Sequence, residues 1–256
     1  MGSEMCIRDR YTVQRSLYPE SNGICHLILL HPPGGLVEGD NLNLNVECLA
    51  NSHSLITTPS AGKVYQCQAD DAGQVQKFTV HAGAKLEWFP QEMILYNKSL
   101  SALSTEIDLV DDGQFAGWEI VCLGRQVAGD FFREGNVVQS IALHRNSKPL
   151  LLERFDLAAM NFALRSQKWG LADNSVFGTF IMTGLSQQHG ELVQILLDDI
   201  DSTNCSVGLT LLNDVLVCRG LSNQSRHLKK TFTQVWSALR QVVLGVAAHE
   251  PRIWRT

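Results

Sequence analysis

Long apolar segments are missing from this chain of 256 residues. No uninterrupted apolar run reaches the roughly 18 residues that a membrane-spanning helix needs. The sequence also lacks a recognisable signal peptide, in which a basic start precedes an apolar stretch. We therefore expect a protein without a membrane partner.

Paired cysteines and clusters of basic residues are missing as well. The seven cysteines are odd in number, and no two have the Cys-x-x-Cys spacing of many zinc and redox sites. They are typical of buried, reduced thiols in a cytoplasmic protein. The formal net charge is -5 and no basic run occurs, which argues against nucleic acid as the main partner.

The common catalytic signatures are also missing. The chain has no Gly-x-Ser-x-Gly and no His-Glu-x-x-His, and the glycines at 34, 35 and 39 lack the Lys-Ser/Thr of a nucleotide loop. Ser60 and Lys63 have the Ser-x-x-Lys spacing of the penicillin-binding enzymes, but their companion motifs are absent. A small-substrate hydrolase that uses Ser60 and Lys63 is therefore a weak alternative.

Alternating apolar and polar residues are what the chain has in abundance. Pairs of such segments flank turns centred on Asn51, Gly83, Gly113 and Asn146, a pattern that predicts β-hairpins. Successive centres lie roughly 30 residues apart. This period suggests stacked β layers, as in a β-solenoid or a folded-over sandwich. Chance spacing in an all-β protein would explain the period equally well.

Helical periodicity appears only in the C-terminal part. It predicts one helix over residues 189–200 and a longer one over 224–244, whose apolar face includes Phe232 and Trp236 and leaves Arg240 off it. No Pro/Gly/Ser-rich linker precedes these helices, so residues 11–256 are expected to form one domain. Residues 1–10 have neither a helical nor a strand period, and they are expected to be a non-native or disordered start.

A few polar groups stand among apolar residues. The rigid His31-Pro32-Pro33-Gly34-Gly35 turn presents His31 and Asp40, which on the residues alone is most simply a hydrogen-bonded turn. Glu119 and Glu153 lie in otherwise apolar strands, where an unpaired carboxylate is costly to bury. Either a cation such as Arg125 or Arg154 satisfies these carboxylates, or they line an internal wet path.

Five phrases in this sequence together resemble the urease accessory proteins called UreD in some organisms and UreH in others. They occur in the family's order over nearly the whole chain, and the final PRIWRT also fits the way these proteins end. The phrases are HPPGG (31–35, ending at Gly39-Asp40), TTPSAGKVY (57–65), LEWFPQE (86–92), GWEIVCLGR (117–125) and LLLER (150–154).

The resemblance implies a mainly β fold: an elongated, stacked-sheet or β-solenoid-like body with two helices in the C-terminal part. It implies a cytoplasmic urease maturation factor, not an enzyme, that is a scaffold and nickel conduit in the complex that inserts nickel into apo-urease. The implied partners are the urease apoprotein, a helical adaptor accessory protein and a GTPase accessory protein. A β-structured interaction module without a metal role is the remaining alternative.

Residues for these roles follow from the same resemblance. No cofactor is expected to be tightly bound, and nickel is expected only in transit, on weak oxygen ligands. The long C-terminal helix is expected to contribute Lys229 and Lys230 to the adaptor surface. The expected nickel path includes Asp40, Glu119 and Glu153, with Thr57, Ser60 and His31 nearby.

Overall fold

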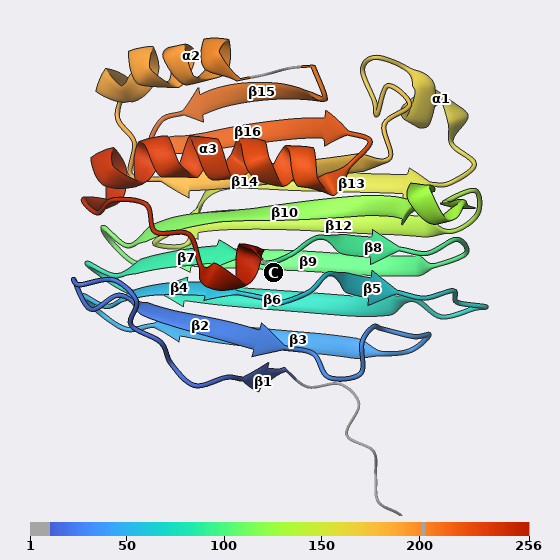
Figure 1. Cartoon of the computed structure of the whole chain (residues 1–256), viewed down its shortest axis with the longest axis horizontal. Helices are drawn as coiled ribbons and strands as arrows, with labels where there is room; N and C mark the ends of the chain where they lie inside the picture. Colours follow the sequence, from blue (N-terminus) through green and yellow to red (C-terminus); the bar gives the residue numbers. More distant parts are fainter. Residues whose placement is uncertain (1–10, 201–202, 256) are drawn as a thin grey trace, which may run out of the picture.

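Two stacked β-sheets form the body of the protein, with helices over the outer face of the larger one (Figure 1). The computed structural model describes residues 11–200 and 203–255, so the expectation for residues 1–10 lies outside the described residues. The larger sheet runs in the order β1 (Thr12–Val13), β2 (Cys25–Leu30), β4 (His53–Thr57), β7 (Lys85–Phe89), β10 (Gln114–Arg125), β14 (Val176–Thr183), β16 (Val215–Ser222) and β15 (Cys205–Leu212), with the short strands β5 (Gly62–Val64), β8 (Met93–Leu95) and β11 (Asp130–Phe131) beside this path. The smaller sheet runs in the order β13 (Lys148–Ala158), β12 (Asn136–Arg145), β9 (Leu100–Leu109), β6 (Ala72–Val80) and β3 (Asn41–Cys48).

The chain passes back and forth between the two sheets in solenoid-like coils. Strands β2, β4, β7 and β10 are parallel neighbours in one sheet, and β3, β6, β9 and β12 are parallel neighbours in the other. The predicted solenoid-like fold is thus confirmed, and the period of roughly 30 residues is one coil. Three of the four predicted hairpins are wrong, because the turns near Asn51, Gly83 and Gly113 join strands of different sheets. Only β12 and β13, around Asn146, form an antiparallel hairpin.

The turns between the sheets stack on one another. Gly83 has a φ of 68°, in the left-handed region, and Asn51 in the preceding coil has a φ of 60°. A Cβ atom on Gly83 would collide with Oδ1 of Asn51. Glycine therefore meets both demands of this position, the backbone angle and the close contact between coils.

The alternation of side chains along β10 separates two cores. Trp118 and Ile120 point outward into the core beneath the helices, whereas Phe115 and Val121 point into the space between the sheets. Glu119 follows the same alternation and so faces the smaller sheet. This central strand is the common wall of both cores.

Both predicted helices are confirmed, as α2 (Gly190–Asp199) and α3 (Ser225–Leu244). Phe232 and Trp236 of α3 are fully buried against the larger sheet, as its apolar stripe predicts. Arg240 was expected off this face but is also fully buried, because two carboxylates neutralise it there. The remaining helical segments are α1 (Phe162–Ser166) and the 3-10 turns η1 (Gln126–Ala128), η2 (Gln187–His189) and η3 (Arg252–Arg255).

A membrane-spanning helix must be both long and apolar. Among residues 11–200 and 203–255, no helix combines the length and the apolar character needed to span a bilayer.

Candidate functional site

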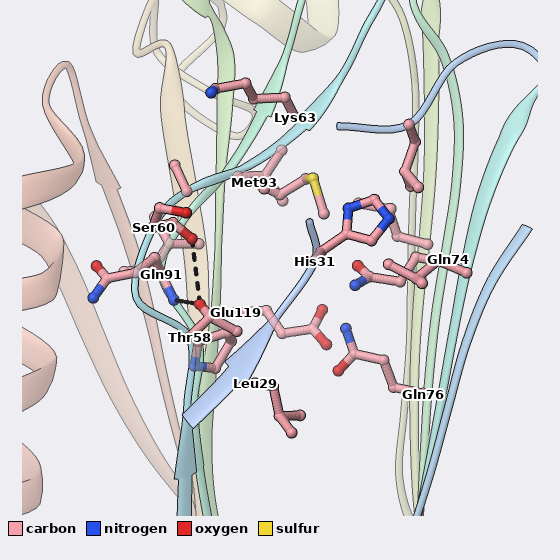
Figure 2. A pocket seen from close by; sticks show the side chains of 18 of the residues that line it. Leu29, His31, Thr58, Ser60, Lys63, Gln74, Gln76, Gln91, Met93 and Glu119 are labelled. Carbon is pink, nitrogen blue, oxygen red and sulfur yellow. Dashed lines mark hydrogen bonds between the residues drawn. The ribbon is translucent and has the colours of Figure 1, made fainter. Parts of the chain in front are cut away.

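A cavity of about 110 Å³, whose wall mixes apolar and polar side chains, lies between the two sheets. The larger sheet and its loops contribute one wall, and the inner face of the smaller sheet contributes the other, because strand alternation turns every second residue inward. Figure 2 shows Glu119 near the centre, with Gln76 opposite it and His31 and Met93 above. The polar residues in its wall are Tyr11, His31, Thr58, Ser60, Lys63, Gln74, Gln76, Gln91, Ser104, Thr105, Glu119 and Gln139.

Glu119 is the carboxylate of this cavity. It accepts hydrogen bonds from Oγ1 of Thr105 and from Nε2 of Gln139, the latter at 2.6 Å. In the part of the chain that the structure describes, no arginine or lysine forms an ion pair with it. The two cations expected beside it pair elsewhere, Arg125 with Asp130 and Arg154 with Asp156. The carboxylate lies deep in the protein but keeps some accessible surface, since it faces the cavity.

The environment of Glu119 disfavours its negative charge. Burial raises the pKa of this carboxyl above its ordinary value, and the hydrogen bonds from Thr105 and Gln139 offset only part of the effect. A cation in the cavity would reverse this balance, because an opposite charge nearby favours the ionised form. The ionised form of Glu119 would therefore gain stability when a cation enters the cavity.

Two other polar atoms in the cavity wall have no hydrogen-bond partner within the described protein. Among the described residues, Oε1 of Gln76 and Nε1 of Trp88 are buried without a protein partner. Tyr11 accepts a hydrogen bond from Gln74 at 2.6 Å, and burial raises the pKa of Tyr11 to about 12, so its hydroxyl stays neutral. Buried polar groups of this kind are normally satisfied by ordered water or a bound molecule.

Three of the six residues expected along the nickel path meet in this cavity: His31, Ser60 and Glu119. The other three do not line it. Asp40 lines a separate hollow on the outer face of the smaller sheet and accepts a hydrogen bond from the backbone of Val37 at 2.8 Å, which closes its turn.

Glu153 lies in an open groove and forms an ion pair with Arg219. The expectation of a structural ion pair thus holds for Glu153, although its partner is Arg219 and not the neighbouring Arg154. Thr57 is fully buried on the outer side, where its hydroxyl bonds to the carbonyl of Phe89 and to Nε1 of Trp254. The next residue, Thr58, takes its place in the cavity wall, because β4 ends at Thr57.

The Ser60–Lys63 pair lacks the geometry of a nucleophile and its base. Both residues line the cavity, but in the described part of the chain no hydrogen bond joins the hydroxyl of Ser60 to Nζ of Lys63. In Figure 2 the amino group of Lys63 lies above Ser60, and no hydrogen bond joins these two described residues. A nucleophilic serine needs its base within hydrogen-bond reach, so the structure gives the hydrolase alternative no support.

Comparison with known proteins agrees with this architecture. The family model described as UreD urease accessory protein matches residues 8–255. The chain belongs to the UreD family. It is 38% identical over 244 residues to the urease accessory protein UreD of Alcanivorax borkumensis, covering 95% of this chain and 82% of the relative. Its identity to the UreD of Saccharophagus degradans is 38% over 249 residues, which cover 95% of this chain and 84% of that protein.

Family membership assigns the chain a role in urease maturation and confirms the resemblance on which that expectation rested. The described residues contain no group of three or more His, Cys, Asp or Glu side chains that could hold a metal ion. Any nickel in this UreD-family cavity would thus meet a mixed set of carboxylate, amide, hydroxyl and imidazole groups around Glu119.

One buried charge network escaped the sequence analysis. Glu87 and Arg240 are both fully buried, and Nη2 of Arg240 lies 2.8 Å from Oε1 of Glu87. The same guanidinium binds Glu20 at 2.8 Å, and the indole of Trp236 donates to Glu87 at 2.6 Å. His53 lies 2.8 Å from Glu87. The network joins the N-terminal segment, β4, β7 and α3.

The pKa shifts within this network follow from its hydrogen bonds. Burial alone would raise the pKa of Glu87, but the hydrogen bonds from His53 and Arg240 and the charge of Arg240 outweigh it and lower that pKa. The apolar phrase around Glu87 was a usable signal, since a buried carboxylate needs a partner. The sequence does not reveal that this partner is Arg240, because Arg240 is distant along the chain.

The two lysines expected on the adaptor surface differ in exposure. Lys230 is exposed on α3. Lys229 is half-buried: its Nζ bonds to the cavity residue Gln91 at 2.6 Å and lies 5.3 Å from the centre of the Trp254 ring. Burial accordingly lowers the pKa of Lys229. The N-terminal half of α3 thus touches one end of the cavity wall.

Proposed function

We propose that this UreD-family chain is a cytoplasmic scaffold and nickel conduit in the complex that inserts nickel into apo-urease. The observation that supports it best is Glu119, a buried carboxylate that faces the cavity without a cationic partner among the described residues. A structural carboxylate at this depth would be expected to have an arginine or lysine beside it, as Glu87 does. Glu119 is instead free to meet a cation that passes through.

The chemistry of the wall suits transit. Carboxylate, hydroxyl and amide oxygens bind Ni²⁺ less tightly than thiolates do, and His31 adds an imidazole that also suits nickel. Such a mixed and incomplete set of ligands would let the ion enter and leave.

The surroundings of the cavity give the path a direction. At one end, the cavity residue Gln91 is bonded to Lys229 of α3, next to the exposed Lys230. We place the helical adaptor and, through it, the GTPase accessory protein on this side. In the opposite wall, Gln139 on β12 of the smaller sheet lines both the cavity and the groove that contains Glu153. Since Gln139 also bonds to Glu119, an ion at Glu119 is one side chain away from that groove.

The test is nickel-dependent activation of urease in a mixture of purified apo-urease, adaptor, GTPase, GTP and this chain. Glu119→Gln keeps the shape of the side chain and removes its charge, so we expect intact assembly and weaker activation. Glu106→Gln is the matched control, because Glu106 is the neighbour of Thr105 on β9 but pairs with Lys77 on the outer face. Full activation by Glu119→Gln would contradict the conduit, and equal losses in both variants would point to a general charge effect.

A further inference from the structure

A groove of about 770 Å³ lies beside the cavity, where the smaller sheet ends. Its floor is the inner face of β14, β16 and β15, and one wall is β13, the edge strand of the smaller sheet. Beyond β13 no described strand covers the inner face of β15, so Ser206 and Gly208 are exposed there. The groove is therefore an uncovered part of the space between the sheets.

Large apolar side chains stand exposed around this groove. Trp169 is 72% exposed, whereas Trp88, Trp118 and Trp236 are almost entirely buried. Leu152, in the opposite wall, is 66% exposed. Met160 and Phe162 are also exposed on the segment that leads to Trp169. Exposed apolar groups in the wall of a groove, with a tryptophan among them, are typical of protein-binding surfaces.

The segment that presents Trp169 is held rigidly. Backbone hydrogen bonds join Leu171 to the carbonyl of Leu164 at 2.8 Å and Asp173 to that of Arg165 at 2.8 Å. The guanidinium of Arg165 in turn donates to the carbonyl of Phe132 at 2.8 Å, which ties the segment to the body.

Two further features restrict the backbone of this segment. A Cβ atom on Gly170 would collide with the carbonyl oxygen of Leu164. Ala172 has a φ of 47°, a left-handed conformation that alanine rarely adopts, whereas Asp173, with a φ of 60°, is a residue type that tolerates it. Such strain is concentrated at functional sites. The fold thus fixes Trp169 in an exposed position before any partner arrives, which reduces the entropy lost on binding.

Charge indicates the chemistry of the occupant. Of the charged residues that line the groove, Arg154 and Arg219 outnumber Glu153, and the two arginines keep 66% and 50% of their side chains exposed. A partner with acidic residues beside an apolar patch would complement this rim. The groove also adjoins Gln139 and hence the proposed nickel path.

We propose that this groove is the docking site for the nickel recipient, the urease apoprotein, through a surface segment that places acidic residues beside an apolar cluster. The inference rests on the proposed function, because the recipient must bind where the path ends. The adaptor would then bind at the opposite end, near Lys230.

Binding measured without nickel separates the two proposals. The affinity of purified apo-urease for this chain is measured by biolayer interferometry, alone and with the adaptor bound. Trp169→Ser is expected to weaken urease binding at least about thirtyfold, the size of an interface hot spot, and to leave adaptor binding unchanged. Tyr18→Ser is the matched control, since Tyr18 is an aromatic residue that is 64% exposed elsewhere, and it should bind urease like the wild type.

A second variant tests the charge of the rim. Arg154→Glu is expected to weaken urease binding and to reduce its dependence on salt, because a favourable charge contact is lost. If Trp169→Ser binds urease as tightly as the wild type does, the docking site is overturned and the conduit is not. The same conclusion follows if Trp169→Ser loses binding to the adaptor but not to urease. Absence of urease binding by the wild-type chain would overturn both proposals. Normal urease binding with full activation by Glu119→Gln would overturn only the conduit.

Discussion

The buried network around Arg240 makes a quantitative test of how this fold is held together. Arg240→Met keeps a side chain of similar length but leaves Glu87 and Glu20 buried without their shared cation. Removing one partner of a buried ion pair costs about 3–5 kcal/mol, because the remaining charge is uncompensated. For a chain of this size each kcal/mol lowers Tm by about 2–4 °C. We therefore expect Tm to fall by about 6–20 °C at neutral pH.

The pH dependence of this loss has a definite sign. The pKa of Glu87 and that of Glu20 are lowered in the folded protein: burial would raise both, but hydrogen bonds, from His53 and Arg240 to Glu87 and from Arg240 and His26 to Glu20, outweigh it. Their stabilising contribution is present above the ordinary glutamate pKa and is lost as pH falls through the lowered folded value. Arg240→Met removes that contribution, so the difference from wild type should shrink as the medium becomes acidic.

Thermal unfolding followed by circular dichroism, at neutral pH and at a pH below the ordinary glutamate pKa, measures this effect. Adding Glu87→Gln to Arg240→Met should restore part of the lost Tm, because one uncompensated charge is then removed. A shift of less than about 2 °C in the single variant would refute the reasoning, since a buried carboxylate cannot lose its cation at so small a cost.

Three further predictions follow from the same contacts. Burial raises the pKa of Glu119 in the folded state, so wild-type stability should fall as pH rises from the ordinary glutamate pKa through the raised one; Glu119→Gln should flatten this part of a Tm-against-pH curve, and an unchanged curve would contradict the assignment. Thr57→Val should cost about 1 kcal/mol in denaturant unfolding through the lost bond to Trp254 and leave urease activation intact, whereas a loss of activation would return Thr57 to the nickel path. Gly83→Ala should destabilise the protein by about 1–2 kcal/mol, because the left-handed backbone disfavours a side chain there and the new methyl group meets Asn51; wild-type stability would show that the turn relaxes freely.

Local patterns in the sequence predicted what depends on neighbours along the chain. The apolar stripe of α3 and the period of the coils both survive in the structure, because burial of one face determines them. Strand alternation alone is also enough to put Glu119 on the face opposite Trp118 and Ile120, and the structure agrees.

Such local patterns do not predict contacts between segments that are distant along the chain. Alternation does not reveal whether a strand pairs with its successor or with a strand one coil away, so three turns were mistaken for hairpins. The pairing of Glu87 with Arg240, and of Glu153 with Arg219, depends on how the coils and α3 stack. Asp40 was grouped with Glu119 on chemistry alone, whereas its turn directs it to the outer face.

The rate of nickel transfer through the assembled complex tests the conduit most directly. Radioactive nickel is loaded on the GTPase, and its appearance in urease is followed over a single turnover with wild type, Glu119→Gln and Glu119→Asp. The conduit predicts transfer at least about tenfold slower with Glu119→Gln, equivalent to about 1.4 kcal/mol in the barrier, and partial recovery with Glu119→Asp, which restores the carboxylate. Equal transfer rates for wild type and Glu119→Gln, in complexes of the same composition, would contradict a nickel path past Glu119.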